Sequence, residues 1–127
     1  MKKIAVSTDR GPKAIGPYSQ AIKVPGLMFI SGQTPLDPAT GEVVGTEINA
    51  QTVRVLENVK RIVESQGRTM ADVVKTTVFL KDMNDFAAMN KIYAGYFPEP
   101  APARSTIQVA RLPKDALVEI EAIIVLE

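Results

Sequence analysis

Three charged side chains near the end of the chain are the strongest candidates for chemistry. Arg104 opens a predicted strand, and Glu119 and Glu121 lie two positions apart in the apolar strand that closes the chain. Because alternate residues of a strand point the same way, both carboxylates share a face with Leu117 and Ile123. Partial burial makes the pKa of a carboxylate tunable, so Glu119 or Glu121 is a candidate acid–base group. A solvated stripe at the rim of the sheet is the alternative interpretation.

Arg104 follows the stiff segment PEPAPA, which is typical of a loop leading into a strand. A guanidinium at this place could grip a planar carboxylate through two parallel hydrogen bonds. It could equally be a surface cation, or a structural partner for one of the two glutamates. The residues alone leave these alternatives open.

Four further residues have weaker claims to a binding role. Ser31 and Gly32, in the segment SGQTP, could present backbone N–H groups to an anion, although most such glycines only make turns. Tyr18 follows a Gly-Pro bend, where a tyrosine packs more often than it reacts. Asn90 lies between apolar positions of a predicted helix, and its simplest role is that of a surface amide.

The elements that must position these residues follow from the hydrophobic periodicity. Residues 18–33 predict two strands around the turn at Pro25 and Gly26. A helix follows, with Thr46 as its cap and Gly67 at its end. Its buried stripe is expected to contain Ile48, Thr52, Val55, Leu56, Val59, Ile62 and Val63.

The second half of the chain predicts a strand, a helix and two closing strands. Thr69 and Asp72 form a small capping turn before a β-branched strand that begins at Val73. The next helix has Asp82 as its N-cap, and three prolines follow its end. Its stripe is expected to contain Phe86, Met89, Tyr93 and Phe97. We therefore expect one α+β domain over residues 1–127, with both helices on one face of the sheet.

The face of the sheet away from the helices is unexpectedly apolar. The last strand places Leu117, Ile123 and Val125 there. The two sides of the middle strand are expected to hold Val73 and Phe79 on one face and Val74, Val78 and Leu80 on the other. Apolar side chains on both faces predict that the uncovered face is buried against another subunit, so we expect a homo-oligomer.

Composition excludes several classes of site. The 127 residues include no histidine, cysteine or tryptophan, so a Ser-His-Asp triad, a Cys-His pair, an ordinary zinc site and disulfides are all excluded. Acid–base work must fall to Asp, Glu, Lys, Tyr, the backbone or water. A net charge of +1 gives no broad electrostatic reason to bind nucleic acid or an anionic membrane.

Nothing in the sequence predicts a membrane or export segment. The first apolar run stops at Ser7, which is too short for a signal peptide. The longest uninterrupted apolar stretch, residues 122–126, cannot span a bilayer. We expect a soluble cytoplasmic protein.

Five segments together resemble the RidA family, also called YjgF, of reactive-intermediate deaminases. They read IGPYSQA, FISGQTPLDPATGEV, QTVRVLENVKRIVESQG, VVKTTVFLKDMNDFAAMNKIYAGYF and PARSTIQVARLPKDALVEIEAI, and they cover nearly the whole chain in order. The resemblance implies a chorismate-mutase-like fold and a homotrimer with ligand clefts between subunits. It also implies cofactor-free hydrolysis of 2-imino acids, such as 2-iminobutanoate and 2-iminopropanoate, to 2-oxo acids and ammonia.

The resemblance also assigns roles to residues. Arg104 of PARS would grip the substrate carboxylate, and Glu119 of VEIEA would position or deprotonate the attacking water. Tyr18, Ser31, Gly32 and Asn90 would line the cleft. Thr106 stands where the family often has cysteine, which excludes thiol chemistry and leaves a mainly backbone role in substrate binding.

Two alternatives to a deaminase are weighed. A ribonuclease or translation inhibitor, as some relatives have been described, is disfavoured by the missing histidine, the near-neutral charge and the lack of an aromatic-basic stripe. A non-catalytic trimer that senses 2-oxo acids would need the same cleft residues, and only turnover separates it from an enzyme.

Overall fold

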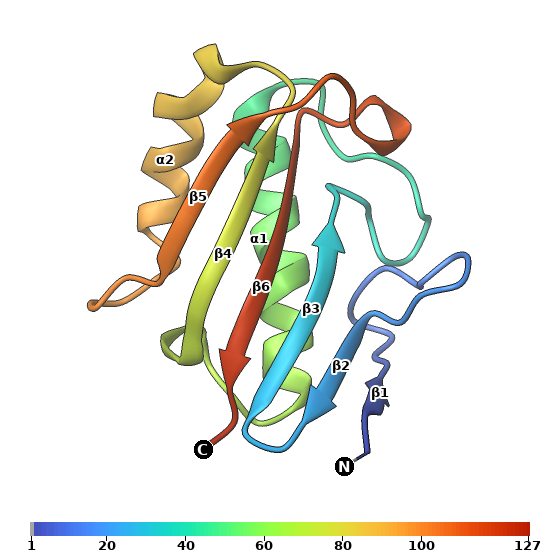
Figure 1. Ribbon diagram of the computed structural model, residues 1–127. Coiled ribbons are helices and arrows are strands. Elements are labelled where there is room, and N and C mark those ends of the chain that lie inside the picture. Colours follow the sequence, from blue (N-terminus) through green and yellow to red (C-terminus); the bar gives the residue numbers. More distant parts are fainter. Residues whose placement is uncertain (1) are drawn as a thin grey trace.

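The computed structural model describes residues 2–127 as a mixed six-stranded sheet with two helices packed on one of its faces (Figure 1). The strands lie in the order β1-β2-β3-β6-β4-β5, and all neighbours are antiparallel except β4 and β5. The strands are β1 (Ile4–Val6), β2 (Ala21–Val24), β3 (Leu27–Gln33), β4 (Val73–Leu80), β5 (Ala103–Gln108) and β6 (Val118–Val125); the helices are α1 (Ile48–Ser65) and α2 (Phe86–Ala94). The expected α+β fold class, with both helices on one face, is confirmed.

Helix α1 covers the centre of the sheet, and its apolar stripe was correctly placed by the spacing of the sequence. All seven residues of that predicted stripe are buried. They pack against Met28 of β3 and against Ile120 and Ile124 of β6, which are fully buried in the same core. The core therefore lies between α1 and the two central antiparallel strands.

The N-cap of α1 is Glu47, so the prediction of Thr46 is wrong by one residue. The two carboxylate oxygens of Glu47 accept hydrogen bonds from the backbone N–H groups of Asn49, at 3.0 Å, and Ala50, at 2.8 Å. A hydroxyl offers one oxygen where a carboxylate offers two, and a negative charge is favoured at this end of a helix. The predicted end is confirmed, since Gly67 follows the helix with φ at +71°.

Asp82 caps a short turn and not α2 itself. Its carboxylate accepts from the N–H of Asn84 at 2.9 Å, which caps the 3₁₀ turn Met83–Asp85. Helix α2 begins only after this turn and ends at Ala94, so Phe97 lies beyond it. Phe97 is nevertheless buried and packs on Tyr93, with ring centroids 4.5 Å apart.

The middle strand β4 departs from simple alternation at its start. Val73 pairs with Ile124, whereas Lys75 pairs with Ile123, so Val74 is the extra residue of a β-bulge. Val73 is consequently buried on the helix side and Val74 is exposed. The expectation that Val73 shares a face with Phe79 is therefore wrong, because Val73 lies in the core on the helix side while Phe79 pairs with Glu119 on the uncovered face.

The edge strand β1 is missing from the sequence prediction. Its three residues pair with β2, and only Val6 is buried. Three residues with one buried side chain are too few to show a period of two. The strand therefore depends on its neighbour and not on a pattern of its own.

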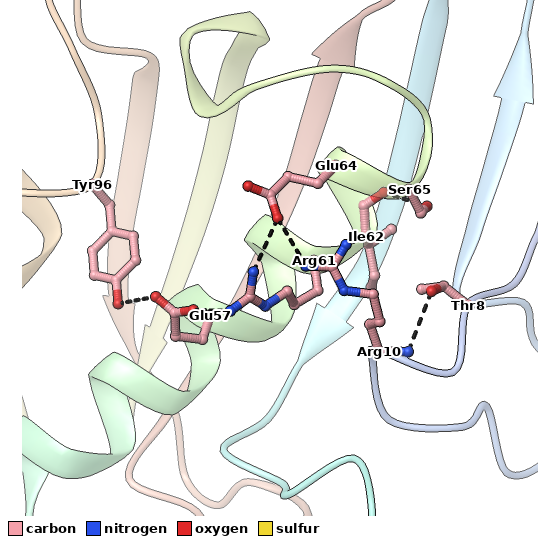
Figure 2. Close-up of polar contacts among 8 residues, drawn as sticks. All are labelled: Thr8, Arg10, Glu57, Arg61, Ile62, Glu64, Ser65 and Tyr96. Carbon is pink, nitrogen blue, oxygen red and sulfur yellow. Dashed lines mark hydrogen bonds and ion pairs between the residues drawn. The ribbon is translucent and has the colours of Figure 1, made fainter.

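A polar network links three segments across the solvent side of α1 (Figure 2). The Tyr96 hydroxyl donates to Glu57 at 2.7 Å, and Arg61 contacts Glu57 at 3.4 Å and Glu64 at 3.1 Å. Arg10 reaches the same Glu64 oxygen at 3.3 Å. Burial, followed by the bond to Glu57, raises the pKa of Tyr96 to about 12, so the tyrosine stays neutral and keeps donating.

The face of the sheet opposite the helices carries exposed apolar side chains. Phe29 of β3 and Ile107 of β5 are each more than 40% exposed. Half-buried Phe79 of β4 and Ile123 of β6 lie on the same face. Single exposed apolar residues are ordinary, but a row of them across four neighbouring strands is typical of a surface that another chain covers.

Candidate functional site

Glu119 lies on β6, on the face of the sheet that no helix covers. Its neighbour across the strand pair is Phe79 of β4, and its side chain is half-buried. Burial, and next the charge of Glu121, raises the pKa of Glu119. A carboxyl group shifted toward neutral pH can exchange protons with a substrate more readily than an ordinary surface glutamate.

Gly32 is the residue that makes room for this carboxylate. A Cβ at position 32 would overlap the Glu119 carboxylate, so any other residue would displace it. The register between β3 and β6 shifts between Ile30 and Gln33, which brings the glycine backbone to this place. Close approach of a side chain to the main chain is thus the reason for glycine here.

A cleft of about 650 Å³ opens beside Glu119. Glu119 and Glu121 line it together with Tyr18, Ser31 and Gly32. All of these except Glu121 were given a site role by the family resemblance, so four of the predicted site residues meet on this face. The Ser31 N–H donates to the carbonyl of Gln20 at 3.0 Å, and its hydroxyl donates to that of Ser19 at 2.6 Å. Both donors of Ser31 are therefore engaged within the chain.

Arg104 lies on the opposite face of the sheet, against α2. One of its Nη atoms donates to the Asn90 side-chain oxygen at 2.7 Å, and the guanidinium carbon lies 4.7 Å from the ring centre of Tyr93. The ring of Phe86 is 5.4 Å away. None of the ion pairs found in residues 2–127 involves Arg104, so it is not a structural partner for Glu119 or Glu121.

This arrangement holds the guanidinium without neutralising it. An amide oxygen and two aromatic faces orient the guanidinium and leave its positive charge in place, whereas a carboxylate would neutralise that charge. A cavity of about 370 Å³ is lined by Arg104, Asn90, Tyr93 and Glu99. The free N–H groups of the guanidinium can therefore meet an incoming carboxylate.

Thr106 lies two residues after Arg104 on β5. Its hydroxyl oxygen is buried and has no hydrogen-bond partner within residues 2–127. Alternate residues of a strand share a face, so Thr106 and Arg104 point to the same side. An orphaned hydroxyl close to a held guanidinium is the kind of group that a bound ligand can satisfy.

The structure thus gathers the predicted residues into two groups. Tyr18, Ser31, Gly32 and Glu119 meet on the open face, whereas Asn90, Arg104 and Thr106 lie on the helix side. Sequence reasoning placed Tyr93 on the stripe of the second helix but did not foresee that its ring supports Arg104. It missed the two lysines of the Glu119 cleft, Lys13 and Lys114, because no local signal marks them.

A mixed sheet with two helices on one face is the fold of the YjgF protein of E. coli, whose crystal structure has a TM-score of 0.92 at 48% identity, covering 98% of this chain and 99% of that one. The Endoribonuclease L-PSP family matches residues 8–126, and the chain belongs to this family. The resemblance to RidA and YjgF proteins is thereby confirmed.

Individual relatives agree on the family and differ in what they are named for. A RutC family protein of Pyrococcus abyssi is 56% identical over 97% of each chain. The chloroplastic Reactive Intermediate Deaminase A of Arabidopsis thaliana is 51% identical over 97% of this chain and 66% of its own. The crystal structure of E. coli TdcF with bound serine has a TM-score of 0.91 at 46% identity, covering 96% of this chain and 98% of that one.

No helix within residues 2–127 is long and apolar enough to cross a membrane.

Proposed function

We propose that this protein is a cytoplasmic deaminase that hydrolyses 2-imino acids, such as 2-iminobutanoate and 2-iminopropanoate, to 2-oxo acids and ammonia. The observation that carries the proposal is Glu119, a half-buried carboxyl group with a raised pKa that faces an open cleft. The name of the Arabidopsis relative and the serine bound to TdcF support a small amino-acid-like ligand.

The chemistry requires only a base, a water molecule and a grip on the substrate. As the water oxygen bonds to C2 of the protonated imine, Glu119 takes a proton from the water. The same carboxylic acid then gives this proton to nitrogen. The C–N bond breaks as the C2 hydroxyl proton passes through Glu119 to the departing ammonia, which leaves as ammonium with the 2-oxo acid behind. A protonated imine is already a strong electrophile, so one positioned base, contributing about 10²- to 10⁴-fold, can suffice.

Arg104 binds the substrate carboxylate in this proposal. Asn90 and the Tyr93 ring hold the guanidinium flat, which leaves one edge for two parallel hydrogen bonds. Thr106 follows two residues later on the edge strand β5, and its proposed part in substrate binding is mainly through the backbone. The carboxylate is thereby fixed and C2 is presented to the water.

The site is proposed to form between chains of a homotrimer. Within one chain, Glu119 faces the uncovered side of the sheet while Arg104 packs against α2 on the other side. A second copy laid on the apolar open face could bring its own Arg104 edge to the first copy's Glu119 cleft. Exposed Phe29 and Ile107, with Phe79 between them on β4, are part of the surface that such packing would bury.

The proposal is tested by turnover of freshly made imine. An amino-acid oxidase acting on alanine or 2-aminobutyrate generates the imine, and semicarbazide traps whatever remains unhydrolysed. The protein should lower the trapped fraction well beyond the spontaneous reaction. If the trapped fraction equals that of buffer while the protein still binds 2-oxobutanoate, the chain is a sensor and the deaminase proposal is wrong.

Glu119→Gln is the matching variant. The amide keeps the shape but cannot take a proton, so we expect at least a hundredfold loss of kcat with binding of a 2-oxo acid retained. Glu121→Gln is the control, because it changes the same charge two residues further along the same strand. A larger loss in Glu121→Gln would identify Glu121 as the base instead.

A further inference from the structure

Two lysines from distant parts of the chain lie at the cleft that contains Glu119. Lys13 belongs to the loop between β1 and β2, and Lys114 to the turn between β5 and β6. Both side chains are exposed, and every ion pair found in residues 2–127 uses an arginine and not a lysine. The cleft therefore has two positive charges that no ion pair of the described chain neutralises.

The turn that carries Lys114 is held in a costly conformation. Lys114 has φ at +56° and ψ at +25°, and Asp115 has φ at +55°, which is the left-handed region that residues with a side chain avoid. Each such residue costs about 1 kcal/mol or more. Two bonds from Arg111 to the Asp115 carboxylate, at 2.7 and 3.2 Å, brace the turn.

Both lysines have anchored positions. The Lys114 ammonium donates to the carbonyl of Gly41 at 2.9 Å, which leaves two of its three N–H groups for a ligand. The buried amide of Gln20 donates to the Pro12 carbonyl at 2.7 Å, directly before Lys13. The strained turn and this anchor together set two cations at one cleft, and strained backbone tends to occur where function requires it.

The two lysines come from the loop before β2 and the turn before β6, whereas the Glu119 carboxylate comes from within β6. Burial and Glu121 raise the pKa of Glu119, whereas an ammonium group beside it would lower that pKa. Glu121 lies toward a neighbouring cavity, which it lines together with Lys75. The lysines are thus available to a substrate group some distance from the reacting carbon.

We infer that Lys13 and Lys114 are specificity-determining residues that favour 2-imino acids whose side chain ends in a second anionic group, such as a carboxylate. The inference rests on the proposed deaminase function and names its substrate class. Arg104 binds the C1 carboxylate and Glu119 activates water at C2, so the side chain remains to reach the lysines. The reaction is unchanged, and only the choice of substrate is affected.

Imines made from glutamate and methionine test the inference, because their side chains have similar length and differ in charge. We expect kcat/KM to be about tenfold higher for the glutamate-derived imine in 0.05 M salt. Lys13→Ala and Lys114→Ala should each lower this ratio about threefold, and Lys114→Arg should largely restore it. Lys3→Ala is the control, since it removes the same charge outside the cleft and should leave the ratio unchanged.

Wild-type protein alone provides a second measurement. Raising the salt to 0.5 M should shrink the preference for the glutamate-derived imine, because exposed charges are screened over a few ångströms at that ionic strength. Hydrolysis of the methionine-derived imine with no preference for the charged substrate would overturn the inference and leave the deaminase standing. Failure to hydrolyse either imine would remove the proposed function and this inference with it.

Discussion

Glu119 and Arg104 lie in opposite chemical environments, which suit the roles of base and clamp proposed for them. Glu119 is half-buried and lies near the charge of Glu121, so its charged form is disfavoured and its pKa rises. Arg104 keeps its charge and loses its freedom, because an amide and an aromatic ring fix the plane of the guanidinium. A base that must accept a proton and a clamp that must hold an anion need these opposite environments.

Arg104→Lys should greatly lower kcat/KM although the positive charge is kept. A lysine ammonium is a point charge that cannot reproduce the planar fork or stack flat on Tyr93. We expect kcat/KM to fall about tenfold to a hundredfold, the cost of losing charged hydrogen bonds. Steady-state kinetics on a variant with native circular dichroism checks this expectation, and near-normal kcat/KM would refute the role assigned to Arg104.

The raised pKa of Glu119 predicts a conflict between activity and stability. A carboxyl group whose pKa is higher in the folded than in the unfolded chain binds protons more tightly when folded. Its contribution to stability is therefore complete below the ordinary value of 4.5 and is lost as pH rises through the folded pKa. Glu119→Gln should then raise Tm at pH 7, and the gain should vanish below about pH 4.

Thermal melts of Glu119→Gln and wild type across this pH range test the prediction, with Glu121→Gln as the exposed comparison. An unchanged or lower Tm for Glu119→Gln at pH 7 would show that the buried charge is compensated. The raised pKa of Glu119 should also move the acid limb of the pH–activity profile to higher pH, because the base must be ionised to accept a proton.

At the scale of elements, regular segments were predictable and irregular ones were not. The α1 stripe and the turn at Gly26 follow from spacing and from backbone freedom, since Gly26 has φ at +83°. The bulge at Val74 and the left-handed pair at Lys114 and Asp115 leave no local pattern, because tertiary contacts impose them. Glu119 and Arg104 were therefore found by residue type, and the lysines of the cleft were missed.

Gly32→Ala should remove most of the deaminase activity while leaving the fold nearly intact. The added methyl group would overlap the Glu119 carboxylate, which can swing away because it ends a flexible side chain. We expect the loss of activity to approach that of Glu119→Gln, with Tm changed by only a few degrees, or about 1 kcal/mol. Gly95→Ala is the matched control, because a Cβ there makes only ordinary contact. Full activity in Gly32→Ala would show that the carboxylate does not need its place over the glycine.

The arrangement of the whole molecule is the reason for proposing that the site forms between chains. The sheet separates the Glu119 cleft from the Arg104 cavity, and apolar residues from four strands lie on its uncovered face. Figure 1 shows that both helices lie on the other face. A homotrimer would bury the uncovered face and unite the two halves. The sequence predicted the apolar face, but it could not show that the catalytic residues lie on opposite sides, because this depends on how α2 packs against β5.

Mixed refolding decides whether the two halves come from different chains. Arg104→Ala and Glu119→Gln, each inactive alone, are unfolded, combined in equal amounts and refolded. If each site takes Arg104 from one chain and Glu119 from its neighbour, about a quarter of the sites in randomly mixed trimers contain neither change. About a quarter of wild-type activity should then return. Tyr18→Ala with Glu119→Gln is the control pair, because these residues line one cleft of one chain and should give no recovery. If the first pair also stays inactive while wild type refolds fully, each site is built within a single chain, and the buried face serves stability alone.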